Sequence, residues 1–184
     1  MAIDPHLLAQ VLRTPASRDV TESPIVRAVI LSDAANAAAL VSALERSQTT
    51  EALNARRILC LFEANAVPHI LGELVNAGPE VRKAGLEILW ALLAGEDGWV
   101  RREALAAAKG NLDLLLDDAR PLPDDMPEYV ERDFRGRLSD LAFIVIRQLM
   151  EPKYDQSLFR SLDEKGRNEE IKRLKARGFG HGIA

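Results

Sequence analysis

The sequence has little of what would support disulfides, aromatic clusters or a strongly charged surface. Among its 184 residues Cys60 is the one cysteine, so an internal disulfide is excluded. Aromatic residues make up 5% of the chain, whereas Leu and Ala are abundant, and this balance favours helices over sheets. The formal net charge of -4 gives no reason to expect a nucleic-acid partner or an anionic membrane.

Long apolar runs are also missing. No window approaches the roughly 18 apolar residues that indicate a membrane-spanning helix, so we expect no membrane partner. The first residues, "MAIDPHLLAQVLRTP", lack the basic region and the apolar run of a secretory signal peptide. We therefore predict a cytoplasmic protein, with the nucleus as the alternative.

Motifs of known catalytic or ligand-binding sites are absent from the sequence. His6, His69 and His181 are far apart and share no metal-ligand spacing. The acid pairs 117–118 and 124–125 flank or lie in a proline-rich stretch, where we expect solvated carboxylates. No phosphate-binding glycine loop and no nucleophile elbow occurs. We therefore predict no enzyme activity, no cofactor and no metal site, and a buried structural role for the Cys60 thiol.

Apolar residues recur at the three- and four-residue spacing of helices, and no alternating strand pattern occurs, so the chain is predicted to be all-α. Asp4, Asp33 and Thr50 are the predicted N-caps of three of these helices. Proline and glycine mark most of the other helix ends. The predicted helices cover about residues 5–13, 24–32, 34–47, 51–64, 67–77, 79–94, 99–109, 111–119, 131–150 and 154–162.

The helices repeat along the chain. A shift of 30 residues places Leu40 on Ile70, Leu44 on Leu74, and Ile58 on Ile88, so both helices of one hairpin match both helices of the next. A third copy with altered spacing contains an acidic, proline-rich insertion between its two helices. The repeats are predicted at 33–64, 65–95 and 98–150, with the insertion loop at 120–130.

The segment from Phe62 to Gly98, "FEANAVPHILGELVNAGPEVRKAGLEILWALLAGEDG", resembles an armadillo repeat. A small-residue turn, a short Leu-rich helix opened by proline, a Pro-Glu-Val turn and a longer helix ending in glycine follow in that family's order. The 30-residue offset is closer to a HEAT hairpin, so the likeness is to the armadillo/HEAT-like superfamily. It implies a short right-handed α-solenoid of about three helical repeats with capping helices, covering residues 1–162 as one domain. Residues 163–184 are predicted to be a charged, Gly-rich tail.

The resemblance also implies a function. Members of this superfamily bind extended peptides along the long last helix of each repeat, so we expect a non-enzymatic protein–protein interaction module, a scaffold or an adaptor of the co-chaperone type. Importin-type grooves carry a tryptophan and asparagine ladder where this chain has Glu87 and Ala91, which argues against binding of nuclear signals. The candidate partner-binding residues are Asn54, Arg57, Lys83, Glu87, Trp90, Trp99 and Asp140.

Three alternatives stay open at this stage. The predicted groove is also compatible with a solvated face that binds nothing, and Trp90 with core packing between repeats. A HEAT-like DNA-repair glycosylase or another nucleic-acid-binding solenoid is the second functional hypothesis, although the acidic charge disfavours it. A short array also exposes apolar ends, which would suit a homodimer.

Basic residues and one aromatic residue cluster near the end of the chain. We expect this segment either to fray or to dock on a partner or on the molecule's own acidic surface. The candidate docking residues are Lys172, Arg173, Lys175, Arg177 and Phe179.

Overall fold

The computed structural model describes residues 4–15, 18–32, 36–46, 49–123 and 136–179. The regular elements in these ranges are all helices, and one isolated β-bridge pairs Pro121 with Arg137. The prediction of an all-α chain is confirmed. The elements, with η for 3₁₀ turns, are α1 (Pro5–Leu12), η1 (Val20–Glu22), α2 (Pro24–Ser32), α3 (Asn36–Val41), η2 (Ser42–Glu45), α4 (Thr50–Leu59), η3 (Ala64–Ala66), α5 (Val67–Leu74), α6 (Pro79–Leu93), α7 (Gly98–Ala107), α8 (Lys109–Leu116), α9 (Leu138–Met150), α10 (Gln156–Arg160) and α11 (Glu164–Arg177).

Polar side chains cap several helices. The Asp4 carboxylate accepts a hydrogen bond from the His6 backbone N–H at 2.8 Å, as the sequence predicts. The cap of α4 is Thr49 rather than Thr50, because the Thr49 hydroxyl accepts from the N–H of Ala52 at 3.2 Å. The predicted cap Asp33 lies outside the described residues.

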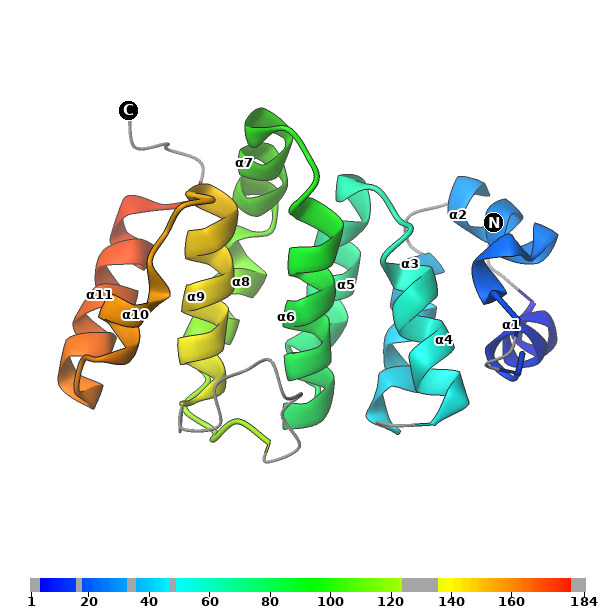
Figure 1. Ribbon diagram of the computed structural model, residues 1–184, viewed down its shortest axis with the longest axis horizontal. Coiled ribbons are helices and arrows are strands. Elements are labelled where there is room, and N and C mark those ends of the chain that lie inside the picture. Colours follow the sequence, from blue (N-terminus) through cyan, green and yellow to red (C-terminus); the bar gives the residue numbers. More distant parts are fainter. Residues whose placement is uncertain (1–3, 16–17, 33–35, 47–48, 124–135, 180–184) are drawn as a thin grey trace.

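The central helices lie in two rows (Figure 1). In one row α3 packs against α5, and α5 against α8; in the other row α4 packs against α6, and α6 against α9. The rows are joined because each helix of the first row also packs against its successor in the second: α3 on α4, α5 on α6, and α8 on α9. At one end α1 and α2 lie beside this double row, and at the other α10 and α11 do.

One apolar core runs through the molecule from α1 to α11. It contains the residues whose spacing defines the predicted stripes, such as Leu40, Ile58, Ile70, Leu74 and Ile88, each no more than 3% exposed. Burying a side chain of this size contributes roughly 1.5–3 kcal/mol relative to exposure. Since every helix pair adds such residues to the same core, no pair forms a separate unit.

Gly85 lies where α6 packs directly on the end of α5. A Cβ atom at this position of α6 would overlap the side chain of Leu74, at the end of α5. Leu74 is fully buried. The absence of a side chain at Gly85 therefore lets α6 pack closely on α5.

The acidic insertion between α8 and α9 is closed at its base. The Leu122 N–H donates to the Gly136 carbonyl at 3.0 Å, the Leu138 N–H to Arg120 at 2.9 Å, and the Ser139 N–H to the carbonyl of residue 118 at 2.9 Å. The described part of α9 begins at Leu138, seven residues after the start predicted from the sequence; residues 124–135 are outside the described ranges. Most of the predicted 120–130 loop therefore also lies outside them.

The charged segment that follows is helical, contrary to the prediction of a tail from residue 163. The Asp163 carboxylate caps α11 by accepting from the Gly166 N–H at 2.7 Å. Ile171 and Leu174, three residues apart, are buried in the common core on the side of α9. Two apolar positions therefore turn one side of this mostly polar helix toward the core.

None of the helices in the described ranges is both long and apolar enough to span a membrane.

Candidate functional site

Three of the predicted partner-binding residues are buried, which corrects the sequence-based assignment. Asn54 is 1% exposed, Lys83 7% and Asp140 0%. The Asn54 amide donates to the carbonyls of Leu12 at 2.9 Å and Thr14 at 2.8 Å, and so fixes the end of α1 on α4. These three side chains are covered by neighbouring helices and cannot line an open surface.

Asp140 belongs to an ionic cluster between α9 and α11. Its carboxylate accepts from Arg137 Nε at 3.2 Å and Nη2 at 2.9 Å, and from the Arg137 backbone N–H at 2.9 Å. Arg167 Nε of α11 lies 3.4 Å from the same carboxylate. The hydrogen bonds to Asp140 raise the pKa of Arg137, although its burial alone would lower it. Asp140 therefore holds α11 on α9, and the sequence analysis did not predict its two arginine partners.

The remaining predicted residues on α4 and α6 are accessible. Arg57 is exposed, Trp90 is 47% exposed, and Glu87 is partly buried. Arg56 Nη2 lies 2.6 Å from Glu87 Oε2, and this ion pair joins α4 to α6. Trp90 is one helical turn after Glu87, so the alternative of a Trp90 buried in the core is wrong.

These residues define a continuous surface that we call the α4–α6 face. Leu53 is 49% exposed and Leu61 is 42% exposed. These apolar side chains lie on the α4 side of the Arg56–Glu87 ion pair, and Trp90 lies on its α6 side. An apolar surface interrupted by charges is the composition found at protein–protein contacts. The face consists of Leu53, Arg56, Arg57, Cys60, Leu61, Glu87, Trp90 and Ala91.

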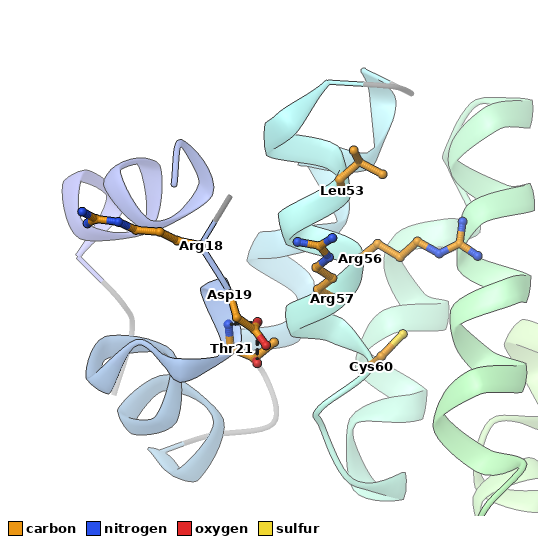
Figure 2. Close-up of a pocket in the computed structure, with 7 residues that line it drawn as sticks. All are labelled: Arg18, Asp19, Thr21, Leu53, Arg56, Arg57 and Cys60. Atoms are coloured by element: carbon orange, nitrogen blue, oxygen red, sulfur yellow. Dashed lines mark hydrogen bonds between the residues drawn. The ribbon is translucent and has the colours of Figure 1, made fainter. Parts of the chain in front are cut away.

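A pocket of about 740 Å³ opens on this face between η1 and α4 (Figure 2). In Figure 2 the Arg56 side chain extends toward α6, whereas Arg18 extends away from α4. The Arg57 side chain lies on α4, between the Arg18 and Arg56 side chains in this view. The pocket is lined by Arg18, Asp19, Thr21, Leu53, Arg56, Arg57 and Cys60.

The pocket has a basic character because three arginines line it against one carboxylate, that of Asp19. Asp19 accepts from the Thr21 hydroxyl at 2.7 Å and from the Thr21 N–H at 2.9 Å. These hydrogen bonds hold the pKa of Asp19 below its usual range, and the nearby charge of Arg57 adds to the effect. The structure shows no ion pair of Arg18 or Arg57 with another described residue. Arg57 acts on Asp19 only at longer range, so its guanidinium can still form an ion pair with an acidic group from outside.

Cys60 is not activated for nucleophilic chemistry. Burial raises the pKa of its thiol, and the charge of Arg56 only partly opposes that effect. A half-buried thiol with a raised pKa remains protonated near neutral pH. The described residues also contain no group of three or more His, Cys, Asp or Glu side chains that could hold a metal ion.

Trp99 lines a different cavity. It is 63% exposed and borders a hollow of about 280 Å³ formed by η3, α5 and α7, together with Pro68 and Val100. The structure therefore does not bring Trp99 and Trp90 into one pocket.

The candidate docking residues near the end of the chain divide into two groups. Lys175 Nζ lies 2.6 Å from Asp117 Oδ2 of the turn after α8, and Phe179 is buried with Lys109 Nζ 5.5 Å from its ring centre. These two contact the molecule's own surface. Lys172, Arg173 and Arg177 are exposed, and Arg173 pairs with Glu170 of its own helix at 2.6 Å.

In comparison with known proteins, no protein-family model, no curated protein and no solved structure matches the chain.

Proposed function

We propose that this chain is a non-enzymatic protein-interaction module, a scaffold or adaptor that binds a segment of another protein along the α4–α6 face. Its architecture would be a short right-handed α-solenoid of about three armadillo/HEAT-like repeats. The pairs α3–α4, α5–α6 and α8–α9 would be the helical cores of these repeats. The helices at both ends would act as caps that cover the apolar ends of the stack.

The packing of successive pairs supports the architecture. Each pair contacts the next through both of its helices, and the apolar core continues across every pair. Such stacking leaves the outer side of a row of helices free for binding, because a stacked pair needs only its neighbours to bury its apolar residues. The α4–α6 face lies on the second row.

The observation that carries the proposal is the α4–α6 face itself. Trp90, Leu53 and Leu61 are large apolar side chains that stay exposed although the chain has a well-formed core. Tryptophan and arginine are the residue types that most often dominate binding energy at protein interfaces. Arg57 lies on the same face, beside a pocket large enough to accept a side chain.

The pocket suggests the chemistry of the partner segment. Arg57 would attract a carboxylate, and the apolar residues of the face would contact an aliphatic or aromatic side chain nearby. We therefore expect the partner segment to combine acidic and apolar residues. A stable complex buries about 1,200–2,000 Å² in total, so the segment would extend beyond the pocket across α6.

Selection of peptides from a random display library on the full chain tests this function. We expect enriched peptides with acidic and apolar residues, whose affinity falls when Arg57→Ala or Trp90→Ala is introduced. Arg177→Ala removes an exposed arginine elsewhere and serves as the control for Arg57→Ala. Peptides that bind all variants with equal affinity would refute the site. Binding of duplex DNA at ~50 mM salt, together with base-excision activity, would favour the glycosylase alternative instead.

A further inference from the structure

A second cavity, of about 430 Å³, lies where the end of α8, the start of α9 and helix α11 meet. It lies apart from the α4–α6 face and shares no lining residue with the pocket there. Most of its polar lining residues carry hydrogen-bond donors. They are Arg137, Ser139, Asn168, Lys172 and Lys175, with Asp117 as the one carboxylate among the lining residues of the described chain.

Ser139 is the least exposed polar residue of this cavity, at 3%. Its backbone N–H is used by the carbonyl of residue 118, but its hydroxyl makes no hydrogen bond to any residue in the described ranges. The hydroxyl does not belong to the fully enclosed side-chain groups without a partner, so it is reachable from the cavity that Ser139 lines. The hydroxyl is therefore a donor left for something that enters the cavity.

The basic side chains that line the cavity have N–H donors that no described residue uses. Arg137 has five N–H donors. Its Nε and Nη2 each donate one hydrogen bond to Asp140, and its Nη1 donates one to Glu164. Lys172 is exposed and has no ion pair within the part of the chain that the structure describes. Lys175 donates to Asp117 at 2.6 Å and to the Asp113 carbonyl at 3.4 Å.

The acid in the cavity competes only weakly. The Asp117 side chain is 65% exposed, and an ion pair at this exposure contributes little because water screens it. Asp117 can turn toward solvent at low cost when another anion approaches Lys175. The cavity is thus rich in donors and poor in acceptors.

We propose that this cavity binds a phosphate group. A phosphate is an acceptor on every oxygen, and lysine ammonium groups with a hydroxyl and an amide suit it as well-spaced donors. The donors come from α9 on one side and α11 on the other, which fits a tetrahedral group better than a planar carboxylate. Lys172 and Ser139 would contact the phosphate directly, and Asn168 would complete the set.

The proposal is independent of the function assigned to the α4–α6 face. A phosphate at this joint would connect α9 to α11, so its binding would also stabilise the docking of α11. The group has two sources with the same chemistry: a phosphorylated small molecule, or a phosphorylated side chain of another protein.

Titration of the ¹⁵N-labelled full chain with inorganic phosphate, at constant ionic strength set by chloride, tests the site. We expect saturable shifts of the backbone amides of Ser139 and of residues 168–175. Lys172→Ala should weaken binding about tenfold, since it removes a charge-assisted hydrogen bond. Lys165→Ala removes an exposed lysine of the same helix that does not line the cavity, and should leave the affinity unchanged.

The absence of saturable shifts at these amides, or an equal loss in the Lys172 and Lys165 variants, would overturn the proposal. Ser139→Ala provides a second readout that leaves the net charge unchanged and should weaken phosphate binding several-fold. A phosphoserine peptide and glycerol 3-phosphate then separate the two sources, because the natural source should bind more tightly than inorganic phosphate does.

Discussion

The α4–α6 face and the joint between α9 and α11 contain the same kinds of charged residue in opposite environments. On the face, Arg57 is exposed, makes no ion pair with a described residue, and acts on Asp19 only at longer range. At the joint, Asp140 is fully buried and contacted by Arg137 and Arg167. The comparison shows that a charged side chain stays accessible in one region and holds two helices together in the other, because the next helix in the stack buries only the second one.

Asp140→Ala should have the largest effect on this comparison. It leaves Arg137 and Arg167 without their buried partner, and breaking a buried ion pair costs about 3–5 kcal/mol. Chemical denaturation should report that loss, and hydrogen exchange should show α11 opening first. A loss below ~1 kcal/mol would mean that Asp140 does not hold the joint.

Trp90→Ala should weaken binding of a selected peptide by about 2 kcal/mol or more, as expected for a central aromatic residue. Its unfolding free energy should change little, because the side chain is half exposed. Trp99→Ala removes a tryptophan outside this face and is the matched control. A smaller loss of peptide affinity in Trp99→Ala than in Trp90→Ala would show that the peptide binds on the α4–α6 face. Fluorescence anisotropy of a labelled peptide measures both variants, and an equal loss in both would contradict that conclusion.

Gly85→Ala tests how closely the two rows of helices approach. The variant should be about 1–3 kcal/mol less stable than Gly72→Ala, since its methyl group overlaps Leu74, whereas a methyl group at Gly72 meets only Asn111 Nδ2 at an ordinary contact distance of 3.9 Å. Both variants gain the same helix propensity, so the difference reports packing alone. Thermal unfolding of the pair measures it, and equal stability would show that α5 and α6 can separate without cost.

A second buried carboxylate, Asp118, makes stability depend on pH. Burial alone would raise the pKa of Asp118, but hydrogen bonds from Arg120 and Arg82 outweigh it and hold the pKa below its usual value. Because the folded pKa is the lower one, this stabilisation is present above the unfolded pKa near 3.8 and is lost as pH falls through the folded value. Asp118→Asn should therefore flatten the acid side of the stability profile, measured by urea unfolding between about pH 5 and 2. An unchanged acid limb would rule out this role for Asp118.

The smallest effect is expected for the exposed ion pair at the same joint. Lys175→Ala should cost about 0.2–1 kcal/mol, because Asp117 is largely solvated. A cost similar to that of Asp140→Ala would show that exposure does not distinguish the two pairs. Urea unfolding under the same conditions measures both.

The sequence predicted the helices well and their environment less well. Periodicity and the cap at Asp4 predicted α1, α5 and α6 closely, because these signals act within a few residues. Spacing shows which residues share a side of a helix, but not which side the next helix covers. Lys83 and Asp140 were therefore predicted to lie on an open surface, whereas neighbouring helices bury both side chains in the structure.

The helix α11 was missed for a related reason. Only Ile171 and Leu174 anchor it, and two apolar residues among many charges are also typical of a frayed end. What holds it is the long-range pairing of Arg167 with Asp140 and of Lys175 with Asp117, which no local pattern predicts. The pocket beside Arg57 was missed likewise, because residues 18–21 reach α4 only in the folded molecule.

The central claim is that a partner segment binds on the α4–α6 face. The most direct measurement is a ¹⁵N chemical-shift titration of the full chain with a selected peptide. The account predicts that the largest shifts fall in residues 53–61 and 87–91, together with the indole N–H of Trp90. Shifts confined to α7 or α11, with these residues unchanged, would contradict it.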